Sequence, residues 1–91
     1  MEAKENKPVI KAEEFLDAKG LNCPLPILKT KVLLNKMQPG QVVHVLSTDP
    51  HSVIDFKAYC ARTKHELLEI RETGNDLFEF FVRRAEHPEK F

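Results

Sequence analysis

The sequence predicts an α/β fold, a two-layer sandwich in which two helices cover one face of a four-stranded mixed sheet. Its apolar periodicity changes along the chain in the order β-α-β-α-β-β. A chain of 91 residues has room for a single hydrophobic core, which two layers enclose economically. Because β-α-β crossovers are right-handed, both helices are expected on the same face of the sheet.

The first half of the chain predicts a strand, a helix and a second strand. Residues 15–19 favour a short strand, and residues 24–37 show helical spacing of apolar side chains. Pro39 and Gly40 are the two central residues that a type II turn prefers, so the helix is expected to end before them. Residues 41–47 are rich in Val and Leu and predict a largely buried strand.

The second helix is expected to begin at Asp49 and Pro50. Aspartate is a favoured N-cap residue, and proline is favoured at the first helical position. Val53, Phe56 and Cys60 then follow at positions i, i+3 and i+7, which places them on one face of the helix. We expect this face to contact the core.

The last two strands are predicted at residues 66–73 and 76–84, joined by a two-residue hairpin turn at Gly74 and Asn75. Alternate residues of the last strand are expected to face the core, namely Phe78, Phe80 and Val82. The others are expected on the helix-free face, which would then be only partly polar: Leu77, Glu79, Phe81 and Arg83.

Charge excludes some classes of function. Basic and acidic residues number 14 each, so a wholesale nucleic-acid binder or a polybasic membrane protein is not expected. Residues 18–48 nevertheless hold four lysines and no acid, and each flank has a net charge of −2. No apolar run is long enough for a transmembrane helix, and residues 1–7 show no secretory signal. We therefore expect a cytoplasmic protein with free thiols.

The most specific local feature is Cys23-Pro24-Leu25-Pro26. Proline is tolerated in the first turn of a helix, so Pro24 is expected at the first helical position and Cys23 at the N-cap. The positive end of the helix dipole stabilises a thiolate there, with Lys19 and Lys29 adding to the field, which predicts a lowered pKa for Cys23. The alternative is that the prolines only start the helix and Cys23 is a small filler residue.

Metal and dithiol chemistry are not indicated. The sequence contains no C-x-x-C pair, and its four histidines lack metal-ligand spacing, so neither dithiol exchange nor a metal site is expected. Cys60 shares the apolar stripe of its helix, and we expect a buried structural thiol there. A second sulfur site, or a disulfide with Cys23, is the alternative role for Cys60.

The pattern around Cys23 resembles the signature of the TusA/SirA-like sulfur-carrier family. The resemblance covers about residues 15–84 and rests on one motif and several later elements: Leu16-Asp17-Ala18-x-Gly20-Leu21-x-Cys23-Pro24-x-Pro26, Lys31, Pro39-Gly40, Ser47-Thr48-Asp49-Pro50, Asp55, Phe56 and Cys60. Membership would imply that Cys23 accepts sulfane sulfur as a persulfide and passes it to a partner protein. Donors of such carriers are cysteine desulfurases or rhodanese-type proteins. Acceptors are relay proteins that lead to tRNA 2-thiouridine formation or to sulfur oxidation, and no cofactor is implied.

The first helix presents two apolar stripes. Ile27, Thr30, Leu34 and Met37 form the stripe that we assign to the core. The opposite stripe begins beside Cys23 and is flanked by lysines, which suggests a docking surface for an acidic partner: Lys19, Leu25, Leu28, Lys29, Val32 and Lys36. A solvated helix face, or a stripe that this small domain buries itself, is the alternative.

One carrier domain is expected at residues 14–85, between a flexible leader at 1–13 and a tail at 86–91. The competing function is a non-catalytic regulatory or protein-interaction module that uses the same helix-tip surface. Direct contact with RNA is not expected, because the lysine-rich window has no aromatic residue on which a base would stack. The composition allows either a monomer or a weak dimer.

Overall fold

The computed structural model describes residues 10–74 and 76–88. Its elements are β1 (Glu14–Ala18), α1 (Leu25–Lys36), β2 (Val42–Ser47), α2 (His51–Thr63), β3 (Glu66–Glu72) and β4 (Phe78–Arg83). The element order and the α/β fold class predicted from the sequence are confirmed. Most of the predicted leader, part of the predicted tail and Asn75 of the predicted turn lie outside the described residues.

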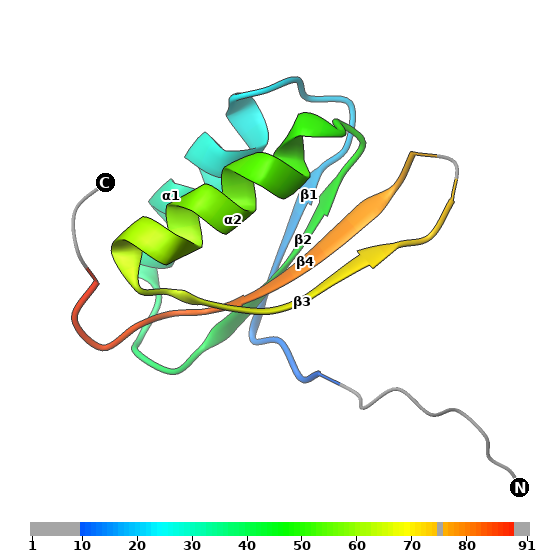
Figure 1. Cartoon of the computed structure of the whole chain (residues 1–91). Helices are drawn as coiled ribbons and strands as arrows, with labels where there is room; N and C mark the ends of the chain where they lie inside the picture. Colours follow the sequence, from blue (N-terminus) through cyan, green and yellow to red (C-terminus); the bar gives the residue numbers. More distant parts are fainter. Residues whose placement is uncertain (1–9, 75, 89–91) are drawn as a thin grey trace, which may run out of the picture.

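The four strands form one mixed sheet in the order β1-β2-β4-β3. β1 pairs with β2 in parallel, whereas β4 pairs antiparallel with both β2 and β3. Both helices lie on the same face of the sheet, as Figure 1 shows, and this is the arrangement that two right-handed crossovers produce. β1 and β3 are the edge strands.

The core lies between the sheet and the two helices. Phe56 of α2 is fully buried and stacks on Phe80 of β4, with ring centroids 4.1 Å apart and planes at 8°. The core stripe predicted for the first helix is confirmed, because all four of its members are buried: Ile27, Thr30, Leu34 and Met37. Two buried threonines satisfy their hydroxyl groups within their own helices, Thr30 by donating to the carbonyl of Pro26 and Thr63 by donating to that of Tyr59.

The helix-free face is partly polar, as expected. Phe81 is nonetheless buried there, because His44 stacks against its ring at 4.3 Å and the guanidinium of Arg71 lies 4.9 Å from its centroid. His44 also lies within hydrogen-bonding distance of Glu79, at 2.8 Å between Nε2 and Oε1. Within residues 10–74 and 76–88, no helix is long and apolar enough to cross a membrane.

The predicted element boundaries differ from those of the structure by one or two residues, as in the first strand, which is Glu14–Ala18 and not 15–19. Pro24 is the N-cap of α1 and Leu25 its first residue, while Pro50 is the N-cap of α2 and His51 its first residue. Asp49 still satisfies a helix-start donor, since its carboxylate accepts the N–H of His51 at 3.0 Å. The hairpin loop has three residues and not two, because Thr73 and Leu77 still pair by a 3.1 Å hydrogen bond.

Two neighbouring side chains of α2 test how much the aromatic stack contributes to stability. Phe56 is fully buried, whereas Ile54 is 66% exposed. We expect Phe56→Ala to lower the free energy of unfolding by about 3–5 kcal/mol, because it removes the stack and leaves a cavity. Ile54→Ala is the matched control and is expected to change it by less than about 0.5 kcal/mol. Urea denaturation followed by circular dichroism measures both, and equal effects would contradict the assignment of Phe56 to the core.

Candidate functional site around Cys23

Cys23 lies in the loop between β1 and α1, two positions before the first residue of the helix, and its side chain is exposed to solvent. The peptide bond between Cys23 and Pro24 is cis. The N–H of Leu25 donates to the carbonyl of Asn22 at 2.8 Å, and the N–H of Leu28 donates to that of Pro24 at 3.1 Å. The helix therefore starts just beyond the cysteine.

The thiol of Cys23 is hydrogen-bonded to a carboxylate of the other helix, α2. The Sγ of Cys23 donates a hydrogen bond to Oδ2 of Asp55 in α2, at 3.0 Å. This hydrogen bond favours the protonated thiol and raises the pKa of Cys23. Desolvation by neighbouring atoms and the negative charges of Asp55 and Asp49 act in the same direction. The lowered pKa predicted from the sequence is therefore wrong.

The reason lies in the start of the helix. The sequence predicts Cys23 at the N-cap, where the positive end of the helix dipole would stabilise a thiolate. In the structure the N–H of Leu25 donates to the carbonyl of Asn22, and the sulfur of Cys23 contacts α2 instead. Lys19 does not supply the expected field either, since its Nζ lies 3.7 Å from a carboxylate oxygen of Asp17.

Asp49 links the loop that contains Cys23, between β1 and α1, to the loop that follows β2. Its Oδ2 accepts the N–H of Cys23, and its Oδ1 accepts the N–H of His51. Both hydrogen bonds favour the ionised carboxylate and lower the pKa of Asp49, the one from His51 contributing more. Close by, Thr48 accepts the N–H of Gly20 at 2.9 Å. Two side chains of one loop therefore fix the backbone of the other.

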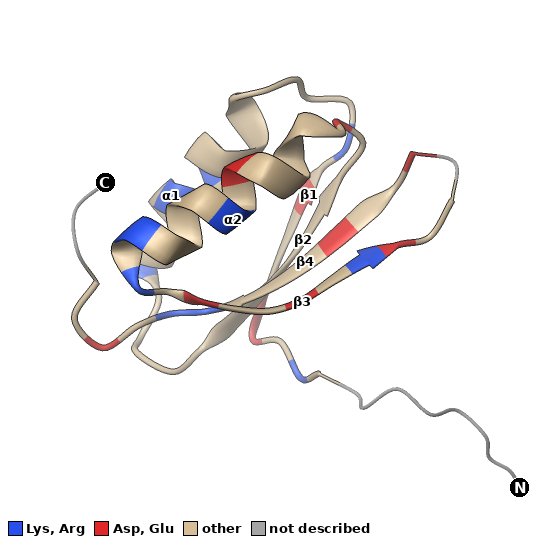
Figure 2. Ribbon diagram, in the orientation of Figure 1, with Lys and Arg blue, Asp and Glu red and all other residues tan. Residues whose placement is uncertain are grey.

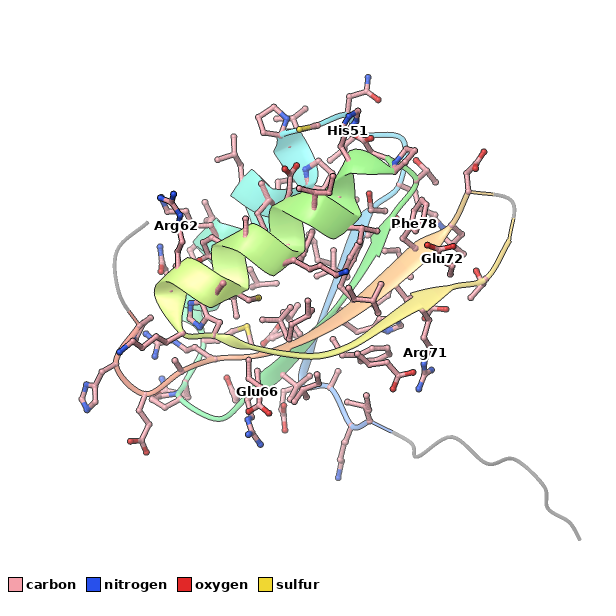
Figure 3. The ribbon with its side chains drawn as sticks, in the orientation of Figure 1. His51, Arg62, Glu66, Arg71, Glu72 and Phe78 are labelled. Carbon is pink, nitrogen blue, oxygen red and sulfur yellow. The ribbon has the colours of Figure 1, made fainter. Side chains whose placement is uncertain are left out.

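His51 contacts the site through Asp49. Its Nδ1 lies 3.6 Å from Oδ1 of that carboxylate, and its own side chain is 74% exposed. Figure 3 shows His51 at the start of α2, at the end of the molecule where the loop before α1 also lies. No acid-base role for His51 follows from this geometry.

The sequence reasoning missed Asp55 and Asp49 as the carboxylates that surround Cys23. The sequence indicates Asp49 as a helix cap and places both residues in the family pattern, without a link to the thiol. A signal was present in the predicted fold. Adjacent parallel strands end at the same edge of a sheet, so the loop after β1 and the start of α2 had to meet there.

Cys60 is buried in α2, as predicted, and both cysteines are free. Burial disfavours its charged form and raises the pKa of Cys60 to about 11. In the described part of the chain, no group of three His, Cys, Asp or Glu residues is close enough to hold a metal ion. Cys23 is thus the cysteine whose thiol this fold presents to solvent.

The predicted docking residues lie on the outer side of α1 and next to it. Leu25, Leu28 and Val32 are all exposed, so the domain does not bury this stripe. The helix carries three lysines and no acid, which Figure 2 shows as blue segments on α1. An open groove of about 470 Å³ runs between α1 and β1, and its lining includes Phe15, Leu16, Leu28, Lys29, Val32 and Lys36. Leu25 and Lys19 are not part of that lining.

The fold is thus a two-layer α/β sandwich with one exposed thiol in the loop just before a helix. The family model described as "Sulfurtransferase TusA" matches residues 14–84, so this chain belongs to the TusA family. The "Sulfur carrier protein TusA" of Allochromatium vinosum is 51% identical over 73 residues, covering 80% of this chain and 95% of that protein. A solved SirA-like protein from Desulfitobacterium hafniense superposes with a TM-score of 0.71 at 26% identity, covering 80% of this chain and 99% of that one.

The raised pKa predicts how Cys23 reacts with iodoacetamide across a range of pH. Because Asp55 and Asp49 favour the thiol, the rate of alkylation should reach half its maximum above the ordinary thiol value of about 8.5. The site of alkylation is assigned by peptide mass mapping, and Cys60 should stay unmodified in the folded protein because it is buried. A midpoint below that of a free cysteine would contradict the assignment of Asp55 as hydrogen-bond acceptor.

Proposed function

We propose that this protein carries sulfane sulfur as a persulfide on Cys23 and delivers it to a partner protein. The observation that carries the proposal is the placement of Cys23, whose thiol is exposed at a loop that lies at one end of the sheet. A carrier has to present one accessible nucleophilic sulfur to two different proteins and has no need to enclose a substrate. Membership of the TusA family supports this role.

The proposed chemistry has two steps. In loading, the thiolate of Cys23 attacks the outer sulfur of a donor persulfide, a bond forms between Sγ and that sulfur, and the donor leaves as a thiolate. In delivery, an acceptor thiolate attacks the outer sulfur on Cys23, and Cys23 leaves as a thiolate that is then protonated. Pro24 and Pro26 hold the backbone on the helix side of Cys23 in place.

The partners we propose are a sulfur donor of the cysteine desulfurase or rhodanese type and an acceptor protein of a sulfur relay. The relay would end in tRNA 2-thiouridine formation or in sulfur oxidation. The persulfide steps above use only protein thiols and need no cofactor. A cytoplasmic setting suits them, because free thiols such as Cys23 and Cys60 persist in reducing compartments. We propose residues 14–85 as the carrier domain.

We further propose that partners dock on the outer face of α1. The exposed leucines and valine there offer apolar contact area, and Lys29 and Lys36 flank them. Among the described residues, neither lysine forms an ion pair, so both are available to an acidic partner. Opposite charge at such a surface raises the rate of encounter and selects the partner.

The carrier role is tested by mass spectrometry. After incubation with a cysteine desulfurase and cysteine, the intact protein should gain the mass of one sulfur. The gain should be lost in Cys23→Ser and kept in Cys60→Ala, because only Cys23 is exposed. Addition of dithiothreitol should remove the sulfur, as expected for a persulfide. No gain with desulfurase or rhodanese donors would favour a non-catalytic regulatory or interaction module.

Charge reversal tests the docking surface. The double variant Lys29→Glu and Lys36→Glu should bind a purified desulfurase that loads Cys23 roughly tenfold more weakly at low salt. Its affinity should also depend less on ionic strength than that of the original chain, because attractive charge pairs have been removed. Isothermal titration calorimetry at two salt concentrations measures both effects.

Lys57→Glu is the matched control, since this exposed lysine lies on α2 instead of α1. It should leave both the affinity and its salt dependence close to those of the original chain. If the control weakened binding as much as the double variant, the effect would come from net charge, and the docking surface would not be on α1.

A further inference from the structure

The contact between Cys23 and Asp55 has a consequence for the energy of sulfur transfer. Asp55 is the fifth residue of α2, and its Oδ2 accepts the thiol proton of Cys23 at 3.0 Å. Resting on the proposed carrier function, we infer that Asp55 is a positioning residue that favours the empty form of the carrier over the loaded form. It would thereby drive sulfur off Cys23 and onto the acceptor.

Both partners of this contact are held in place by their surroundings. Asp55 lies on a helix that is anchored by the fully buried Phe56 directly after it and by the buried Ser52 one turn before it. On the other side, the N–H of Cys23 is bound to the carboxylate of Asp49. A swing of either element away from the other would break these contacts, so the carboxylate remains beside the sulfur.

The contact with Asp55 stabilises the empty form of the carrier. A thiol has one proton to donate, and a carboxylate is a strong acceptor, so the hydrogen bond stabilises the protonated Cys23. The hydrogen bond also fixes the position of Sγ relative to the loop between β1 and α1. The raised pKa of Cys23 reports the same preference, and its causes include the charges of both Asp55 and Asp49.

The same carboxylate destabilises the loaded form of the carrier. A persulfide is more acidic than the thiol from which it forms and is an anion at neutral pH, so it has no proton to donate to Asp55. The hydrogen bond is therefore absent, and a negative sulfur lies near the carboxylates of Asp55 and Asp49. Like charges at this distance repel, which disfavours the loaded state.

The balanced reaction shows the effect on the equilibrium. With a small persulfide donor RSS⁻, the exchange is Cys23–SH + RSS⁻ ⇌ Cys23–SS⁻ + RSH. The bond between the two sulfurs of the donor breaks, the bond between Cys23 Sγ and the outer sulfur forms, and the thiol proton passes through solvent to the departing RS⁻. Asp55 stabilises the left side and destabilises the right side, so it lowers the equilibrium constant for loading.

The experiment measures this constant with glutathione persulfide and glutathione as the exchange pair. After equilibration at pH 7.4 (an assay condition) the loaded and empty protein are quantified by intact mass, and the site is mapped to Cys23. We expect Asp55→Asn to raise the ratio of loaded to empty protein by roughly two- to fivefold, since it removes the charge while keeping the shape of the side chain. The pH midpoint for alkylation of Cys23 should fall in the same variant.

Asp76→Asn is the matched control. It makes the same chemical change at the β3–β4 turn, where asparagine suits the positive φ of 57°. It should alter neither the loading ratio nor the alkylation midpoint. Asp55→Glu keeps the charge and should leave the ratio close to that of the original. Asp55→Ser removes the charge and should raise the ratio as Asp55→Asn does, so it serves as the test if Asp55→Asn fails to fold. Thermal melts of each variant establish that it is folded.

The two proposals fail in different ways. If the original protein takes up no sulfur on Cys23 from any donor, the carrier function is wrong, and the inference about Asp55 falls with it. If the original protein loads and Asp55→Asn has the same loading ratio, the carrier function stands and the role of Asp55 is overturned. A purely structural role would change the melting temperature while leaving both the ratio and the alkylation midpoint unmoved.

Discussion

The parallel pairing of β1 with β2 is the constraint on which the site depends. It brings the carboxyl ends of both strands to one edge of the sheet, so the loop that holds Cys23 and the loop that starts α2 meet there. Asp49 and Thr48 then bind the backbone of the first loop from the second. Cys23 is thereby positioned by groups that lie 26 and 32 residues away in the chain and not by the helix that follows it.

The two carboxylates beside Cys23 accept different kinds of hydrogen bond, although the negative charge of each raises the pKa of the thiol. Asp49 accepts two backbone N–H groups, which have no proton to lose, so its own ionised form is stabilised and its pKa is lowered. Asp55 accepts the proton of a thiol that titrates, so the stabilised species is the protonated Cys23. The same kind of side chain therefore fixes the shape of the loop in one case and sets the protonation of its sulfur in the other.

The fold could be predicted from the sequence because its signals are local and mutually consistent. The spacing of apolar side chains predicted six elements in the right order and the buried stripe of α1 from Ile27 to Met37. The predicted length of the hairpin loop is wrong, because Thr73 and Leu77 pair at the base of the loop. Asp76 also adopts a positive φ, which the sequence preference of Gly74-Asn75 for a two-residue turn does not indicate. The neighbouring prolines predicted that Cys23 lies just before α1, although the N-cap is Pro24 and not Cys23. The electrostatic surroundings of Cys23 were not predicted, because they come from α2 and depend on tertiary packing.

The separation of charge along the chain acquires a different meaning in three dimensions. Residues 18–48 carry four lysines and no acid, and they enclose Cys23 in sequence. In space, Lys19 pairs with Asp17, and Lys29 and Lys36 line the groove between α1 and β1. The charges that act on the thiol are the carboxylates of the acidic second half of the chain. An exposed thiol that is kept protonated reacts slowly with stray electrophiles, because only the thiolate is nucleophilic. The proposed cationic docking surface and the anionic environment of the sulfur are thus two separate features, which the neutral net charge of the chain conceals.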